Sequence, residues 1–107
     1  MTARTPDVTD VARVSKLLFG NRWRLSVAAF IAEHPEGVVT VREIARELGC
    51  SDSVVMPLVV GFRDAGLLDE PQRDGREVRY TRLPHSFWEL ARSVHHDITN
   101  MARASHP

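Results

Sequence analysis

The chain has 107 residues, of which 43% are hydrophobic and 26% are charged, and its 14 basic residues balance 14 acidic ones. This length accommodates one domain, and this composition is typical of a globular protein and not of a disordered one. A formal net charge of zero excludes a uniformly basic nucleic-acid coat and a polycationic membrane binder. A partner that needs charge must therefore meet charge that is unevenly distributed along the chain.

The cysteine content and the apolar runs narrow the class of protein further. Cys50 is the single cysteine, so no internal disulfide forms, and the sequence has no Cys/His spacing typical of a zinc site. No apolar run approaches the ~20 residues needed to cross a bilayer, and the first residues lack the apolar segment of a signal peptide. We therefore expect a cytoplasmic protein with no membrane partner.

The first third of the chain predicts a tail and two helices. Residues 1–6 are polar, so we expect a flexible tail before one domain at residues 7–104. Apolar spacings of three and four predict an amphipathic helix over residues 8–18. Asn21 is suited to cap a second helix over residues 22–33. The apolar positions are Val8, Val11, Val14 or Ser15 and Leu18 in the first helix, and Leu25, Ala28, Ala29, Ile31 and Ala32 in the second.

Two more helices are predicted after a brief extended segment at residues 38–40. Thr40 and Glu43 have the spacing of a capping box, which predicts a helix that ends at Gly49. Ser51 is expected to cap a longer helix that continues to about residue 65. The core-facing positions of this longer helix are Val55, Leu58, Val59 and Phe62.

The last third of the chain predicts a hairpin and a long helix. Extended stretches on both sides of Asp74-Gly75 indicate a β-hairpin. A final helix is expected over residues 85–104, where apolar side chains recur at alternating spacings of four and three, as in a coiled-coil seam. The seam consists of Phe87, Leu90, Ala91, Val94, Ile98 and Met101.

A short helix, a turn, a longer helix and a hairpin form the order of a helix-turn-helix followed by a wing. Residues 18–31, 40–68 and 73–83 resemble the opening helix, the helix-turn-helix and the wing of bacterial regulators of the ArsR and MarR type. The resemblance covers residues 8–104. It implies a mainly α winged helix-turn-helix, with about five helices and a small β-hairpin, and a homodimeric repressor that binds palindromic duplex DNA.

By the same resemblance, the terminal helices join two copies of the chain. The seam from Phe87 to Met101 would be the dimer interface, together with the helix at residues 8–18. The alternative is that Phe87, Val94 and Ile98 pack only on their own domain. The length of the last helix on so small a domain favours dimerisation.

The second helix of the pair is expected to enter the DNA major groove. Its outward positions are Ser51, Ser53, Met56, Pro57 and Val60. This face is almost without polar groups, and a proline inside the helix is expected to bend or weaken its first turns. The two serines are suited to a phosphate, and Met56 and Val60 to thymine methyl groups. An alternative is that the apolar Met56/Pro57/Val60 face binds another protein.

The wing carries more basic charge than the helix. Arg73, Arg76, Arg79 and Arg82 outnumber two acids there, and we expect Arg73 and Arg76, which flank the tip, to contact the DNA backbone or a narrow minor groove. Arg79 is a further DNA-binding candidate. Arg22, Arg24, Arg42 and Arg46 are further phosphate candidates. For Arg42, pairing with the neighbouring Glu43 or Glu47 is the alternative.

No constellation indicates catalysis or a cofactor. The sequence lacks a converging nucleophile and base, a glycine-rich phosphate loop and the HExxH pattern, so we expect no enzyme. His95 and His96 are neighbours that point about 100° apart on a helix, so no metal site is expected from them. Cys50 is either a redox switch or, more commonly at such a turn, a small buried side chain.

Overall fold

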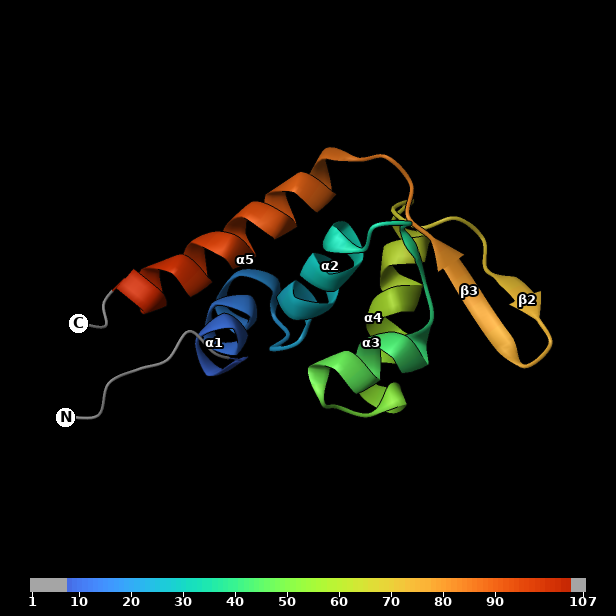
Figure 1. Ribbon diagram of the computed structural model, residues 1–107, viewed down its shortest axis with the longest axis horizontal. Coiled ribbons are helices and arrows are strands. Elements are labelled where there is room, and N and C mark those ends of the chain that lie inside the picture. Colours follow the sequence, from blue (N-terminus) through green and yellow to red (C-terminus); the bar gives the residue numbers. More distant parts are fainter. Residues whose placement is uncertain (1–7, 105–107) are drawn as a thin grey trace.

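The computed structural model describes residues 8–104, and their side chains from residue 10 to residue 101. The elements in chain order are α1 (Val8–Phe19), α2 (Arg24–Glu33), β1 (Val38–Val39), α3 (Val41–Leu48), α4 (Asp52–Asp64), β2 (Gln72–Asp74), β3 (Glu77–Thr81) and α5 (Ser86–Ala104) (Figure 1). This order confirms the predicted winged helix-turn-helix. The tail expected at residues 1–6 lies outside the described residues.

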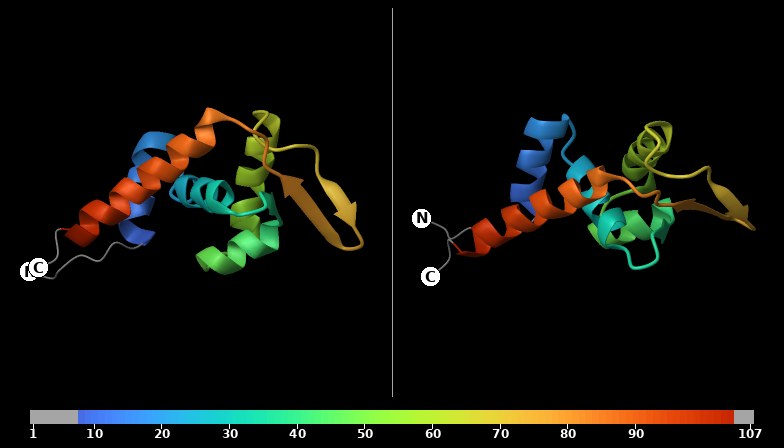
Figure 2. Two further views of the ribbon diagram at one scale, coloured as in Figure 1. Left: turned by 45° about the horizontal axis from the view of Figure 1, so that its top comes forward. Right: turned by 90° about the horizontal axis from the view of Figure 1, so that it is seen from above.

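Helix α2 lies at the centre of the molecule and is enclosed from several sides. Helices α1 and α5 pack on it, and α3 and α4 contact it as well (Figure 2). The buried side chains of α2 are Leu25, Ser26, Val27, Ala28, Ala29 and Ile31. The prediction of one apolar side was therefore incomplete, because neighbours on several sides also bury Ser26 and Val27.

The turn between α1 and α2 differs from the expected helix cap. The Oδ1 atom of Asn21 accepts the Trp23 N–H at 2.7 Å, which forms a turn, and α2 begins only at Arg24. Ser15 is fully buried, and its Oγ accepts the Leu25 N–H at 2.9 Å. Leu18, which was expected on the buried face of α1, is 62% exposed.

The helix-turn-helix follows the predicted pattern with one exception. The capping box is present, since the Glu43 N–H donates to Thr40 Oγ1 and the Thr40 N–H donates to the Glu43 carboxylate. Gly49 ends α3 in the left-handed region, with a φ of 72°. Ser51 occupies the N-cap position of α4, as predicted, but its side chain makes no capping hydrogen bond, and its Oγ is instead hydrogen bonded to Ser53 Oγ at 2.9 Å.

Helix α4 buries the face that the sequence predicts. The four predicted core positions, Val55, Leu58, Val59 and Phe62, are all buried. The helix continues through Pro57 from Asp52 to Asp64, although the proline has no N–H for the Ser53 carbonyl. The opposite face of α4 is therefore presented on a continuous helix.

Three short antiparallel strands form the wing, in the order β1-β3-β2. The loop of the hairpin is Gly75-Arg76, one residue later than predicted, because Asp74 still pairs with Glu77 in the ladder. Gly75 has a φ of 64°, and Arg76 does not have a positive φ, as is typical of a two-residue type II′ turn. Arg76 therefore lies at the tip itself.

Arg82, counted by sequence among the wing charges, instead caps the end of α2. Its Nη1 donates to the carbonyl oxygens of Ile31 at 2.7 Å, Ala32 at 2.9 Å and His34 at 3.0 Å. Its backbone N–H donates to the Gly37 carbonyl at 2.7 Å. Gly37 has a φ of 70°, and a Cβ there would lie 3.2 Å from the Arg82 side chain. The wing is thus joined to the central helix at this one residue.

Helix α5 is anchored by a tryptophan that the seam pattern missed. Trp88 is 5% exposed, and its Nε1–H donates to the Leu83 carbonyl at 2.9 Å. Its ring contacts those of Phe62 and Phe87, with centroids 5.7 and 5.3 Å away. The packed side of α5 is therefore broader than a narrow seam. None of the described helices is long and apolar enough to cross a membrane.

We expect Arg82→Met to lower the free energy of unfolding by about 1.5–3 kcal/mol, because a charged donor to three carbonyl groups is lost. Urea denaturation measures this change. Arg46→Met is the matched control: Arg46 is exposed, and its replacement should cost less than ~0.5 kcal/mol. Equal losses in the two variants would contradict a special role for Arg82.

Candidate nucleic-acid interface

The outward face of α4 carries the side chains that the sequence predicts. Ser51, Ser53 and Pro57 are exposed, Met56 is 44% exposed, and Val60 is half-buried. At the far end of the helix, the Arg63 guanidinium donates to the Asp64 carboxylate at 2.9 and 3.2 Å. The face therefore presents two hydroxyl groups and three apolar side chains, and the charge of its one arginine is balanced by Asp64.

The wing uses one of its predicted DNA-binding arginines internally. Asp74 and Glu77 lie directly opposite each other in the β2–β3 ladder, where like charges are destabilising. Arg79 offsets both charges, with its Nη1 atom 3.3 Å from Asp74 Oδ2 and its Nη2 atom 3.1 Å from Glu77 Oε1. In the described part of the chain, Arg73 and Arg76 are exposed and have no such partner. These two residues carry the available charge of the wing.

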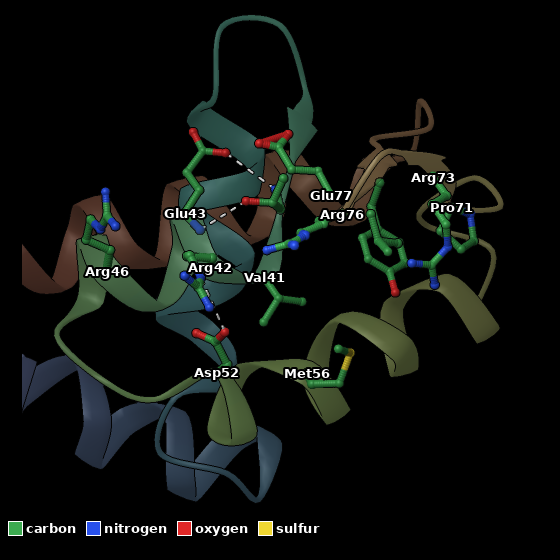
Figure 3. Close-up of a pocket in the computed structure, with 13 residues that line it drawn as sticks. Val41, Arg42, Glu43, Arg46, Asp52, Met56, Pro71, Arg73, Arg76 and Glu77 are labelled. Carbon is green, nitrogen blue, oxygen red and sulfur yellow. Dashed lines mark hydrogen bonds and ion pairs between the residues drawn. The ribbon is translucent and has the colours of Figure 1, made fainter.

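A groove of about 940 Å³ separates the wing from α3 and the first turns of α4 (Figure 3). Its lining is Thr40, Val41, Arg42, Glu43, Arg46, Asp52, Met56, Pro71, Arg73, Arg76, Glu77, Val78 and Tyr80. The Arg76 side chain points across the groove toward α3. The structure thus brings the arginines of α3 and those of the wing to one open surface, together with Met56 of α4.

The sequence predicted each of these arginines as a separate DNA-contact candidate and did not predict that they share a groove. Arg42 and Arg46 are four residues apart on the exposed side of α3, so their common face was readable from the sequence. Their distance from the wing depends on how β3 folds back beside α3, which no local pattern specifies. Of the other side chains of β3, Tyr80 is buried and Val78 is half-buried.

Acidic residues reduce the positive charge of the groove without cancelling it. Arg42 Nε lies 3.7 Å from Asp52 Oδ2, which corrects the expected pairing with Glu43 or Glu47. Both side chains are exposed, so the pair contributes only about 0–1 kcal/mol. Glu43 is occupied by the capping box and by His34 Nε2 at 3.1 Å. Approaching anions therefore meet mainly Arg46 and the two wing arginines.

The six seam residues of α5 divide into enclosed and exposed positions. Ala91 is fully enclosed by its own domain, and Phe87, Val94 and Ile98 pack against the same core while remaining partly exposed. Leu90 and Met101 are 54% and 72% exposed. Leu17 and Leu18 of the adjacent α1 are similarly exposed, at 70% and 62%. The inner side of the seam therefore packs on its own domain, as the alternative interpretation expected. Large apolar side chains remain exposed on the outer side of α5 and on α1.

Cys50 and His95 lie in environments that favour their neutral forms. Burial, and secondarily the Asp52 carboxylate, raise the pKa of the Cys50 thiol, which disfavours the thiolate. Burial lowers the pKa of His95, against the opposing effect of Glu33. Among the described residues, no three His, Cys, Asp or Glu side chains are grouped as a metal site would need.

Comparison with known proteins identifies the family. Residues 21–77 match the MarR family, a segment that extends from the start of α2 into the wing. The chain belongs to the MarR family. The broader resemblance to ArsR regulators is not specifically supported. No curated protein matches this MarR-family chain by sequence.

Solved structures share the fold at low sequence identity. MepR, a transcription regulator of the Staphylococcus aureus multidrug efflux pump MepA, has a TM-score of 0.63 and 13% identity, over 91% of this chain and 71% of MepR. A MarR family protein of Mycobacterium tuberculosis, in complex with salicylic acid, has a TM-score of 0.59 and 17% identity, over 90% of this chain and 70% of its own. A predicted DNA-binding transcriptional regulator from E. coli has a TM-score of 0.53 and 22% identity, over 87% and 90%.

We expect Cys50 to react slowly with iodoacetamide near neutral pH. A raised pKa keeps the thiol protonated until the pH passes that pKa, so the alkylation rate should rise at a higher pH than for free cysteine. Asp52→Asn should shift the rate profile modestly toward lower pH, because burial is the larger cause. Asp64→Asn is the control. A profile that matches free cysteine would contradict this environment.

Proposed function

We propose that this MarR-family chain is a bacterial, cytoplasmic transcriptional regulator that binds duplex DNA as a homodimer and acts as a repressor. One observation carries the proposal: Met56, from the outward face of α4, and the two exposed arginines of the wing, Arg73 and Arg76, line the same open groove. The structural neighbours named as transcription regulators support the same function.

The geometry suits a duplex that lies across α4 and the wing. The first half of α4 enters the major groove, where Met56, Pro57 and Val60 approach the base edges. The hydroxyl groups of Ser51 and Ser53, next to the free N–H groups of the α4 N-terminus, face the backbone phosphates. Arg73 and Arg76 then contact the backbone or the minor groove beside it. These contacts place most of the electrostatic attraction in the wing.

Dimerisation would use the terminal helices. The exposed apolar side chains on α1 and α5 are Leu17, Leu18, Leu90 and Met101. Burying them against a second copy removes apolar surface from water, at roughly 25 cal/mol per Å². Two α4 helices related by a two-fold axis match a palindromic site, and a dimer bound over a promoter blocks polymerase. The repressor assignment rests on the family resemblance.

A second candidate function follows from the composition of α4. Its outward face contains no cationic side chain apart from Arg63, which is paired with Asp64, and Met56 is 44% exposed. Such a face also fits an apolar surface of another protein. In that case the Met56/Pro57/Val60 face would be a docking site, and the chain would bind DNA only non-specifically.

Selection of bound sequences from random duplex DNA at near-physiological salt separates the two candidates. A DNA-binding regulator enriches a palindrome. A protein-docking module enriches none, and its partner is lost from a pull-down when Met56→Asp places a charge on the face. Failure to enrich any palindrome would overturn the proposed function.

We expect Arg73→Ala/Arg76→Ala to weaken binding to the enriched duplex and to flatten its salt dependence. Loss of two phosphate contacts from each copy of the proposed dimer lowers the slope of log K against log salt by about 3.6 in magnitude. Fluorescence anisotropy across a salt series measures both effects. Arg13→Ala on α1, which lies far from the wing, should leave the slope unchanged. An unchanged slope in the double variant argues against the wing as the phosphate-binding element.

We expect Leu90→Asp/Met101→Asp to convert a dimer into a monomer, because two charges would enter the buried interface. Light scattering after size exclusion should give twice the chain mass for the parent protein and the single-chain mass for the variant. Met56→Asp carries the same kind of change on the opposite side and should leave the mass unchanged. A dimeric double variant contradicts this interface.

A further inference from the structure

Helix α4 lacks the side chains that commonly distinguish base pairs by hydrogen bonding. The helix is fully described from Asp52 to Asp64 and contains no Asn, Gln or Lys, and its only arginine, Arg63, is paired with Asp64. Bidentate contacts to guanine need Arg or Lys, and those to adenine need Asn or Gln. The polar groups that remain near the start of the helix are Asp52, which lies beside Arg42, and the Ser53 hydroxyl, which is hydrogen bonded to Ser51. Sequence readout by α4 must therefore depend on other groups.

The groups that α4 does present are apolar and closely spaced. Met56, Pro57 and Val60 share the outward face, and Gly61 beside them is exposed. A Cβ at Gly61 would meet nothing within 4 Å, so packing inside the fold does not require glycine there. Because Gly61 has no side chain, the helix surface is flat at this point, and the wall of a DNA groove can approach the backbone closely. The face is thus shaped for shallow apolar contact.

The major groove contains one apolar group on the base edges, the C5-methyl group of thymine. We propose that Met56, Pro57 and Val60 read thymine methyl groups, so that the half-site of this regulator is rich in A·T pairs. The wing favours the same composition, because unpaired arginines bind the narrow minor groove of A·T tracts. The arginines also supply the positive charge that the phosphates require and that α4 lacks. This inference rests on the proposed DNA-binding function.

The test uses the duplex that is selected from random DNA by binding, and it replaces individual thymines in that duplex by deoxyuridine. This change removes only the methyl group and keeps the base pair. Burying one methyl group contributes enough for an approximately fourfold change in Kd, so each contacted thymine should cost about that factor, and two about fifteenfold. In Met56→Gln or Val60→Thr, replacing thymine by deoxyuridine should no longer weaken binding at one or more of the thymine positions. The new side chain does not make the apolar contact with the methyl group there. Both changes conserve size, and Met56 is exposed, so folding should persist.

Two controls separate the methyl contact from other effects. Arg73→Ala/Arg76→Ala should bind more weakly overall and keep the full uracil penalty, since the wing does not contact the major-groove methyl group. Changing a contacted T·A pair to C·G should weaken binding, and 5-methylcytosine at that position should recover part of the loss. Equal affinity for thymine and uracil duplexes, or a G·C-rich enriched half-site, overturns the inference while the DNA-binding function stands. Enrichment of no duplex overturns both.

Discussion

The Arg82 guanidinium group at the end of the central helix is a main anchor of the wing. Arg82 follows β3 in the chain, and its side chain donates to the carbonyl oxygens of Ile31, Ala32 and His34, at and just beyond the C-terminus of α2. The same residue holds the segment before β1 through its own N–H. A positive charge is favourable there, because the helix dipole places partial negative charge at that end. The hairpin thus projects from the core in a defined direction, although its strands are short and exposed.

The overall charge of the chain is neutral, but its arginines differ in role: some are bonded within the fold, and others are exposed. Some stabilise the fold, as Arg82 and Arg24 do by donating to backbone carbonyl groups. Arg79 balances two acids that the hairpin register places opposite each other. Four exposed arginines line one groove, namely Arg73 and Arg76 of the wing and Arg42 and Arg46 of α3. Net charge was therefore a poor guide to binding, and the count of partnered arginines is a better one.

Local signals predicted the helices well and the turns less well. The Thr40–Glu43 box and Gly49 act within a few residues, so their effect was readable. Ser51 stands at the predicted N-cap position, but its hydroxyl group bonds to the neighbouring Ser53 and not to a backbone N–H of α4. The outward face of α4 was correct, since burial of one face of a helix fixes the other. The roles of Arg82 and Trp88 were missed because their partners come from the chain folding back, as does the groove between α3 and the wing.

The aromatic contacts at the base of α5 also constrain how far apart two DNA half-sites can lie. Phe62 of α4 packs on Phe87 and Trp88, so direct aromatic contacts join α4 to the long terminal helix. In the proposed dimer, pairing of the α5 helices then sets the rotation between the two α4 helices. Half-sites must recur on the same side of the duplex, about one helical turn apart. A single inserted base pair changes that rotational phase, and the rigid connection through Phe62 leaves the protein little freedom to follow it.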